Sequence, residues 1–207
     1  MDRSNRPPAY DLVVRVLVVH AHPSATSFAA AVRDAAVDGL VRAGHEVRLH
    51  DLCADGFAAS MSPAERVAYH SDSPVIDPLV RRYADDVAWC TALVFVYPTW
   101  WMNVPPVMKA WLERVLVPGV AFDFDEAGKV RSKLTNVRRI VGISTYGAER
   151  RYVRLMTDGG RRTLTRALRV SCGLNTRTRW IALYAMANRT ASERADFLER
   201  VRCEVAP

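Results

Sequence analysis

The sequence predicts an α/β fold in which helices cover both faces of a five-stranded parallel sheet. Apolar runs of strand length alternate five times with longer helical stretches along the 207 residues. The runs Val13 to Val19 and Ala92 to Tyr97 are almost continuously apolar, as in strands buried on both faces. No linker or repeat interrupts the alternation, so we expect one domain at residues 12–207 after a flexible polar tail at residues 1–11.

The individual elements follow from start and stop signals in chain order. Gly44 follows the first expected helix as a C-cap, and Thr190 precedes the last as an N-cap. Pro105 suits the first turn of its helix, whereas Gly159 and Gly160 indicate a break within theirs. Strands are expected at residues 13–19, 46–50, 92–97, 137–144 and 177–183, helices at 27–43, 77–90, 105–116, 152–171 and 191–203, and irregular connections at 51–74 and 117–135.

The number of strands selects the topology. Right-handed crossovers leave few arrangements, and five strands favour the flavodoxin-like order 2-1-3-4-5, a three-layer sandwich, over the larger dinucleotide-binding order. In either order, ligands bind outside the carboxyl ends of the strands. The residues that follow the strands are therefore the candidates for function.

Composition narrows the function classes. The formal net charge is +7, but the arginines are spread between acidic residues, and no recognised nucleic-acid motif accompanies them. We therefore expect no nucleic-acid partner and a basic surface that suits anionic ligands. The four cysteines form no CxxC pair, so no metal site is expected. No apolar run approaches the ~20 residues of a membrane helix, and no signal-peptide pattern is present, so we expect a cytoplasmic protein without direct membrane insertion.

The stretch "VLVVHAHPSATSF" ends the first strand with polar residues. It lacks both the GxGxxG pattern of a dinucleotide-binding start and the GK[ST] of a triphosphate loop. Hydroxyl groups and free N–H groups at a helix start favour an anion, so Thr26, Ser27 and Phe28 could bind a phosphate, with His22 adding a contact. The alternative is that Thr26 or Ser27 only caps the helix and His22 lies in a surface loop.

Two more strand ends carry candidate residues. In "YPTWWMNVPP" a stiff loop presents two adjacent tryptophans, which suits stacking on a flat heteroaromatic ring, although a structural aromatic cluster is the alternative. In "STYGAERRY" a short polar turn with a glycine allows close approach to a ligand, and Tyr152 can supply a phenol. No Ser-His-Asp spacing or GxSxG elbow is present, as expected where a cofactor carries the chemistry.

Together these segments resemble the NAD(P)H:quinone oxidoreductase family of flavodoxin-like flavoproteins, which includes the DT-diaphorases and the ancillary proteins of bacterial potassium efflux systems. "VLVVHAHPSATSF" is similar to the phosphate-binding start of that family, and "VFVYPTWWMNVPPVMKAWLERVLVPGVAFDF" is similar to its flavin-binding segment. "ISTYG" matches a turn that is usually rich in threonine and glycine. The similarity extends from about Val13 to Leu183 in order and spacing.

The resemblance implies a role for each matching residue. The residues matched to flavin phosphate contacts are His22, Thr26, Ser27 and Phe28. Those matched to contacts on one side of the flavin ring are Pro98, Thr99, Trp100, Trp101 and Met102. Those matched to contacts at the opposite ring edge are Ser144, Thr145, Tyr146 and Gly147. Tyr152 matches a catalytic tyrosine that handles charge on the reduced ring, and Asp158 stands where animal members have a histidine, so it is a second catalytic candidate. Phe122 and Phe124 match aromatic residues that the partner subunit contributes to the substrate pocket.

The resemblance also implies an activity. It predicts a homodimer with FAD or FMN bound non-covalently, which transfers a hydride from NAD(P)H to a quinone-like acceptor by a ping-pong mechanism. Reduction of azo or nitro compounds, or a dedicated reductive step in a biosynthetic pathway, is the first alternative. A flavin-containing regulatory subunit of a membrane transporter is the second. A one-electron carrier is disfavoured because flavodoxins are typically acidic.

Overall fold

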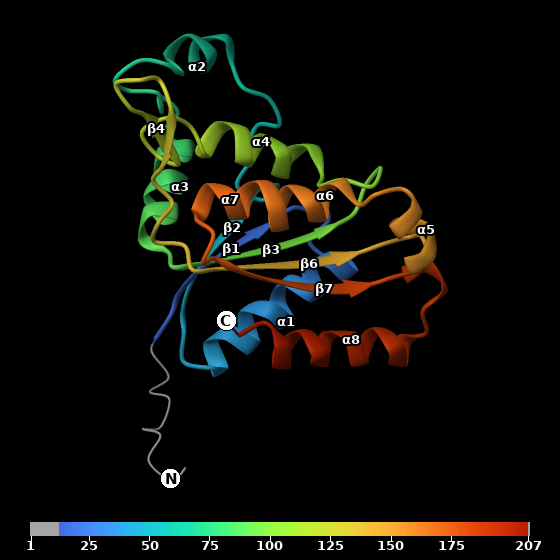
Figure 1. Ribbon diagram of the computed structural model, residues 1–207. Coiled ribbons are helices and arrows are strands. Elements are labelled where there is room, and N and C mark those ends of the chain that lie inside the picture. Colours follow the sequence, from blue (N-terminus) through green and yellow to red (C-terminus); the bar gives the residue numbers. More distant parts are fainter. Residues whose placement is uncertain (1–12, 207) are drawn as a thin grey trace, which may run out of the picture.

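The computed structural model describes residues 13–206 and contains a five-stranded parallel sheet of order β2-β1-β3-β6-β7 (Figure 1). In sequence order of the sheet strands this is 2-1-3-4-5, so the predicted flavodoxin-like topology is confirmed. The strands are β1 (Arg15–His20), β2 (Glu46–Asp51), β3 (Ala92–Pro98), β6 (Arg139–Thr145) and β7 (Arg177–Leu183). The expected tail at residues 1–11 lies outside the described residues.

Helices cover both faces of the sheet (Figure 1). On one face lie α1 (Phe28–Arg42) and α8 (Ala191–Glu204), and on the other lie α3 (Pro78–Trp89), α4 (Pro106–Val115), α6 (Gly159–Arg162) and α7 (Arg169–Cys172). Side-chain caps start the long helices as predicted: Ser27 accepts from the N–H of Ala30, and Thr190 forms a capping box with Glu193.

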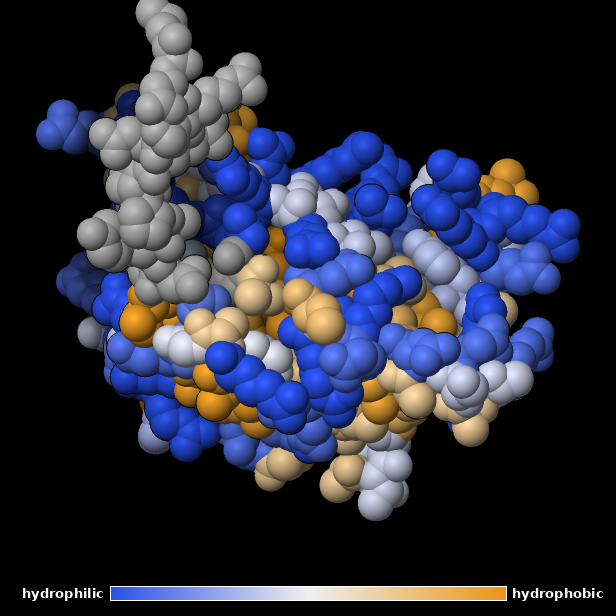
Figure 2. Space-filling model, turned by 90° about the horizontal axis from the view of Figure 1, so that it is seen from below, coloured by the Kyte–Doolittle hydropathy of each residue, from blue (hydrophilic) through white to orange (hydrophobic). Residues whose placement is uncertain are grey.

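The central strands β1, β3 and β6 are buried on both faces, as their continuous apolar runs predict, whereas the edge strands β2 and β7 are partly exposed. In β1, Val16 and Val18 pack toward α1 and α8, whereas Leu17 and Val19 pack into the cluster that includes residues of α3 and α4. The outer face formed by α1 and α8 is mostly hydrophilic with small apolar patches between the charged side chains (Figure 2). Among residues 13–206 no helix is long and apolar enough to cross a bilayer.

Three segments differ from the expected elements. Residues 51–74 contain α2 (Pro63–Ala68), and the long connection after α4 contains an antiparallel hairpin of β4 (Phe122–Phe124) and β5 (Val130–Ser132). The expected helix at 152–171 is divided into α5 (Arg150–Leu155), α6, a π-helix η1 (Thr163–Leu168) and α7. The break falls just before the two glycines, which begin α6. A 3-10 turn, η2 (Met186–Asn188), precedes α8.

Candidate functional site

The loops after β1, β3 and β6 meet at the carboxyl edge of the sheet, as the strand order predicts. The rings of His22 and Trp100 lie with their centroids 6.2 Å apart, which joins the first loop to the second. The Thr99 N–H donates to the Thr145 carbonyl at 2.8 Å, and the Thr99 hydroxyl lies 2.8 Å from that of Ser144. These contacts fix the three loops relative to one another.

The loop after β3 contains a tight turn with unusual backbone angles. Trp100 and Asn103 exchange N–H to carbonyl bonds of 3.1 and 2.9 Å, and between them Trp101 and Met102 have φ angles of +48° and +56°. Two consecutive positive φ angles correspond to a type I′ turn, which normally requires asparagine or glycine. Within the described chain, no hydrogen bond engages the N–H of Trp101 or Met102, so both groups are free to donate to a ligand.

The start of α6 holds this turn in place. The Gly159 N–H donates to the Met102 carbonyl at 2.8 Å, and the Gly160 N–H approaches the same oxygen at 3.3 Å. A Cβ atom on Gly160 would lie 2.9 Å from the Tyr97 hydroxyl and 3.0 Å from the Val104 nitrogen, so no larger residue fits there. Two neighbouring glycines in a helical pattern were the only sequence signal of this contact.

The turn presents aromatic surface to solvent. Trp101 is fully exposed and Trp100 is 41% exposed, although large apolar side chains are normally at least half covered. A cavity of about 740 Å³ opens beside them, and it is lined by Thr99, Trp100, Trp101, Asn103, Val104, Pro106 and Lys109. The structural aromatic cluster considered above is therefore not what the loop forms. The strained backbone and exposed indoles are instead features of a ligand-binding loop.

The loop after β1 combines capping with free donors. Ser27 caps α1, so the alternative that this residue caps the helix is correct. Its hydroxyl oxygen already accepts a hydrogen bond from the Ala30 N–H. Thr26 is exposed beside Ser24, with 3.3 Å between their hydroxyl oxygens. Nδ1 of His22 lies 3.0 Å from the Ser24 nitrogen and 3.2 Å from the Ser24 oxygen, and in the tautomer that accepts from the Ser24 N–H the proton on Nε2 is available to an anion. Phe28 is half-buried against Phe197 of α8.

A group of buried polar side chains lies beneath the loop after β6. The Tyr146 hydroxyl donates to Asp158 at 2.5 Å, and its ring stacks on Tyr184 with a centroid separation of 4.7 Å. Burial and the Asp158 carboxylate raise the pKa of Tyr146 far above its ordinary value. The neighbouring Tyr97 hydroxyl is buried without a hydrogen-bond partner in the described chain, and burial raises its pKa also.

The predicted residues of the loop after β6 therefore divide into buried and exposed ones. Ser144 and Tyr146 are each 1% exposed, so their side chains support the loop from beneath, and their contact with a ligand stays a prediction. Gly147 is exposed and has open space where a Cβ would lie. Of the two catalytic candidates, Tyr152 is 51% exposed on α5, whereas Asp158 caps α6 and is bound to Tyr146. The carboxylate of the second catalytic candidate is thus engaged by Tyr146.

Phe122 and Phe124 lie on the β4–β5 hairpin, far from these loops and beyond the opposite end of α4 (Figure 1). Their rings contact each other with centroids 5.7 Å apart, and Phe124 is 49% exposed. Within one chain they line no part of the cavity beside Trp101. Their predicted pocket role requires a second subunit.

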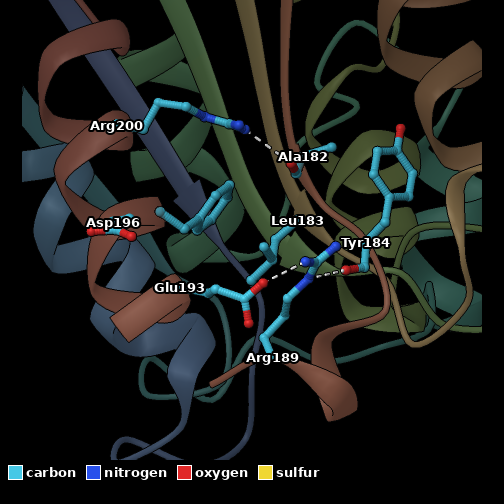
Figure 3. Close-up of a pocket in the computed structure, with 8 residues that line it drawn as sticks. Ala182, Leu183, Tyr184, Arg189, Glu193, Asp196 and Arg200 are labelled. Atoms are coloured by element: carbon cyan, nitrogen blue, oxygen red, sulfur yellow. Dashed lines mark hydrogen bonds and ion pairs between the residues drawn. The ribbon is translucent and has the colours of Figure 1, made fainter. Parts of the chain in front are cut away.

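A second cavity adjoins the start of α1, and no sequence motif indicated it (Figure 3). It has a volume of about 370 Å³, between the end of β7 and the first turns of α8, and Phe197 joins it to Phe28. Arg189 donates to the Tyr184 carbonyl at 3.0 Å and to Glu193 at 2.7 Å, and Arg200 donates to the Ala182 carbonyl at 2.9 Å. The cavity therefore has fixed polar walls.

Comparisons with known proteins agree with this geometry. The sequence model of the flavodoxin-like fold family matches residues 14–202. The NAD(P)H dehydrogenase (quinone) 1 of Cavia porcellus is 30% identical over 154 residues, which cover 67% of this chain and 55% of that protein. The human ribosyldihydronicotinamide dehydrogenase (quinone) is 28% identical over 166 residues, covering 72% of this chain and 70% of that protein. The resemblance predicted from the strand-end motifs is confirmed.

Solved structures give the same fold. The NAD(P)H:quinone oxidoreductase from Methanothermobacter marburgensis superimposes with a TM-score of 0.78, covers 93% of this chain and 96% of its own, and is 24% identical. At that identity the likeness establishes the fold alone. This chain spans little more than half the length of the guinea-pig relative.

Proposed function

Because the chain belongs to the flavodoxin-like fold family, we propose that it is a flavin-dependent oxidoreductase that uses NAD(P)H to reduce a quinone or a similarly flat acceptor. The names of the guinea-pig and human relatives, both quinone dehydrogenases, support this activity. The observation that carries the proposal is the Trp100–Asn103 turn, because it combines exposed indole surface with two free N–H donors at the ligand-binding edge of the sheet.

The residues present fit a flavin. An isoalloxazine ring is flat, with carbonyl and nitrogen acceptors along one edge, and the turn offers N–H groups and aromatic surface of matching kind. A flavin phosphate requires donors at a helix start, which the exposed Thr26, the Nε2–H of His22 and the first N–H groups of α1 supply. Pro98 and Thr99 fix where the turn begins, since Thr99 is bound to both Ser144 and Thr145.

The cavity beside Phe28 bears on the choice between FAD and FMN. FMN ends at its single phosphate, whereas FAD continues into an adenosine diphosphate. The cavity between β7 and α8 provides about 370 Å³, and the ring of its lining residue Phe197 has its centroid 6.3 Å from that of Phe28. We expect this cavity to receive the adenosine half if the cofactor is FAD. Separation of the released cofactor by liquid chromatography distinguishes the two.

When bound, the flavin supplies hydride transfer between NAD(P)H and the acceptor, and the protein supplies orientation and electrostatics. The free N–H groups of Trp101 and Met102 favour negative charge on the bound ring. The N–H groups of Gly159 and Gly160 donate to the Met102 carbonyl and thereby fix the orientation of those donors. Tyr152 provides a phenol beside the site, and the bond from Tyr146 orients Asp158, which in turn starts α6.

We expect the site to be completed by a second copy of the chain. Trp101 is fully exposed and borders a cavity that is open to solvent on the α4 side. In the proposed homodimer, Phe122 and Phe124 of one subunit cover this side of the other and form an apolar pocket for the acceptor. Sedimentation velocity measures the assembly, and a monomeric holoprotein would contradict this part of the proposal.

The experiment that tests the function is the visible absorption spectrum of the purified protein, followed by anaerobic addition of NADPH or NADH. Oxidised flavin bands that bleach on addition are expected. Reoxidation is then followed with a quinone, an azo dye and a nitroaromatic compound to identify the acceptor. A protein that retains no flavin, and that neither binds nor is stabilised by added FMN or FAD, would exclude the proposed function.

A further inference from the structure

An arginine-rich cavity lies next to the proposed flavin site, on the far side of α6. It has a volume of about 410 Å³ and is bounded by α5, α6, η1 and Tyr184 at the end of β7. Five of its nine lining residues are arginines, namely Arg150, Arg154, Arg161, Arg162 and Arg166. None of these five arginines is assigned to the flavin in the proposed function.

The guanidinium groups of these five arginines have no ion-pair partner anywhere in residues 13–206. Nearby Arg151, by contrast, pairs with Glu149 at 2.8 Å. The single carboxylate in the cavity wall is Asp158, which already accepts from the Tyr146 hydroxyl and from the Arg161 N–H. The cavity thus has a net positive charge that the protein itself leaves uncompensated.

The local structure gathers these charges on facing elements. Arg150 and Arg154 share one side of α5 at the i, i+4 spacing, and Arg162 and Arg166 have the same spacing across α6 and η1. Like charges at this spacing destabilise a helix. The π-helical turn is itself a rare conformation that is frequent at functional sites. Such an arrangement is stabilised by a bound anion.

We propose that this cavity binds the adenosine 2′-phosphate end of NADPH and thereby makes NADPH the preferred donor over NADH. The inference rests on the proposed function and specifies its donor. A 2′-phosphate carries up to two negative charges and several acceptor oxygens, which match guanidinium groups. The ring of Tyr184 lies in the cavity wall and offers a surface for the adenine.

The cavity and the proposed flavin site share a structural element, which makes simultaneous occupation by one NADPH molecule possible. Asp158 lines the cavity, and the next residue, Gly159, donates to the Met102 carbonyl of the turn. A donor whose nicotinamide stacks over a flavin at that turn can therefore extend its other end across the start of α6 into the arginines. NADH lacks the 2′-phosphate and gains nothing from them.

Isothermal titration of the flavin-loaded protein with two nucleotides tests the cavity without turnover. We expect 2′,5′-ADP to bind at least tenfold more tightly than 5′-AMP, which differs only by the 2′-phosphate. The double variant Arg154→Gln, Arg166→Gln should remove most of that difference. Arg177→Gln is the matched control, because Arg177 is an exposed arginine at the opposite end of β7, and it should change binding by less than twofold.

Donor kinetics provide the second measurement. The double variant should lower kcat/KM for NADPH about tenfold and change kcat/KM for NADH by less than twofold. Equal binding of 2′,5′-ADP and 5′-AMP would overturn the proposal. Inorganic phosphate that competes for the cavity as strongly as 2′,5′-ADP would also overturn the proposal, because the cavity would then be a general anion site. Failure of both NADPH and NADH to bleach the flavin would instead refute the proposed function, so the two failures are distinguishable.

Discussion

Two polar regions of this molecule differ in how completely their hydrogen bonds are satisfied. One lies between β2, α2, α3 and α4, and its buried polar groups bond to one another. The other lies at the carboxyl edge of the sheet, where donors, a buried hydroxyl and five arginines have no partner in the described chain. The first region is complete as the chain folds, whereas the second is the region to which the proposed function assigns the flavin and its electron donor.

The complete region is built around two buried side chains. The His50 ring stacks on Tyr83 at a centroid distance of 3.6 Å, donates from Nε2 to Asp86 at 2.9 Å and accepts the Trp111 indole N–H at 3.2 Å. Arg114 is 4% exposed and donates to Glu65 at 2.8 Å, to the Ala58 carbonyl at 2.9 Å and to Asp77 at 2.9 Å. Each of these groups contributes to stability because its partners are present.

The incomplete region has the opposite properties. Trp101 and Met102 adopt φ angles that cost free energy, the Trp101 ring lies wholly in solvent, and the Tyr97 hydroxyl is buried without a bond. The concentration of these costs at one edge of the sheet indicates that stability has been given up there for binding.

The largest predicted effect of a single substitution tests the complete region. Replacing Arg114 with Met removes a guanidinium that bonds Glu65 and Asp77, leaving a buried carboxylate uncompensated. We expect the free energy of unfolding to fall by about 3–5 kcal/mol, measured by urea denaturation. The control is Arg42→Met, since Arg42 is 73% exposed in its pair with Asp38 and should cost less than about 1 kcal/mol. Equal losses in the two variants would show that the Arg114 network is not a stability element.

The pH dependence of stability should come from one histidine in each region. Burial lowers the pKa of His50, and likewise that of His20 at the end of β1, from 6.5 to about 4. The unfolded chain therefore binds protons between about pH 6.5 and pH 4 that the folded chain does not, so the stability is full above pH 6.5 and falls as the pH is lowered through that window.

Each histidine contributes roughly 3 kcal/mol to this loss. Urea titrations between pH 7.5 and pH 4.5 measure the total, and His50→Gln should remove about half of the slope. A free energy of unfolding that stays level across the window would contradict the buried, neutral state of both rings.

Trp101→Ala addresses the incomplete region. Because the side chain is fully exposed, the cofactor-free protein should keep its melting temperature. Loss of the stacking surface should weaken flavin binding by tenfold or more, about 1.4 kcal/mol, measured by fluorescence titration. Val67→Ala, at another exposed apolar position (85%), should leave both quantities unchanged. A large loss of melting temperature in Trp101→Ala would mean that the indole is structural.

The smallest predicted effect concerns strain. Glycine adopts a positive φ without steric cost, so Met102→Gly should raise the free energy of unfolding of the cofactor-free protein by about 1 kcal/mol. The same variant should weaken flavin binding, because the turn is no longer fixed in the binding conformation. A matched change at Met61, which has an ordinary backbone, should not be stabilising. Destabilisation by Met102→Gly would contradict the strain argument.

The sheet and its helices were predictable because they depend on local patterns. All five strands were located to within two residues, the central ones by their apolar runs, and Ser27 and Thr190 were recognisable as helix starts. The β4–β5 hairpin was not predicted, since strands of three residues carry too little periodicity. The strand ends identified the candidate loops, because the carboxyl edge follows from topology alone.

The details of the site depend on contacts between distant residues. Two non-glycine residues at positive φ cannot be inferred from their types, because the conformation is imposed by the bond from Gly159. Tyr146 was expected beside the ligand but is buried, since Asp158 binds its hydroxyl from across the α5–α6 turn. The arginine cavity likewise forms only when α5 and η1 fold toward each other.

Hydrogen–deuterium exchange with and without bound flavin tests most directly whether the carboxyl edge is the region completed by a cofactor. FMN and FAD are each added to cofactor-free protein. We expect strong protection in peptides covering residues 22–28, 99–104 and 144–147, and unchanged exchange around Arg114 and His50. Protection that is absent from those loops, or that appears instead between α3 and α4, would contradict the account.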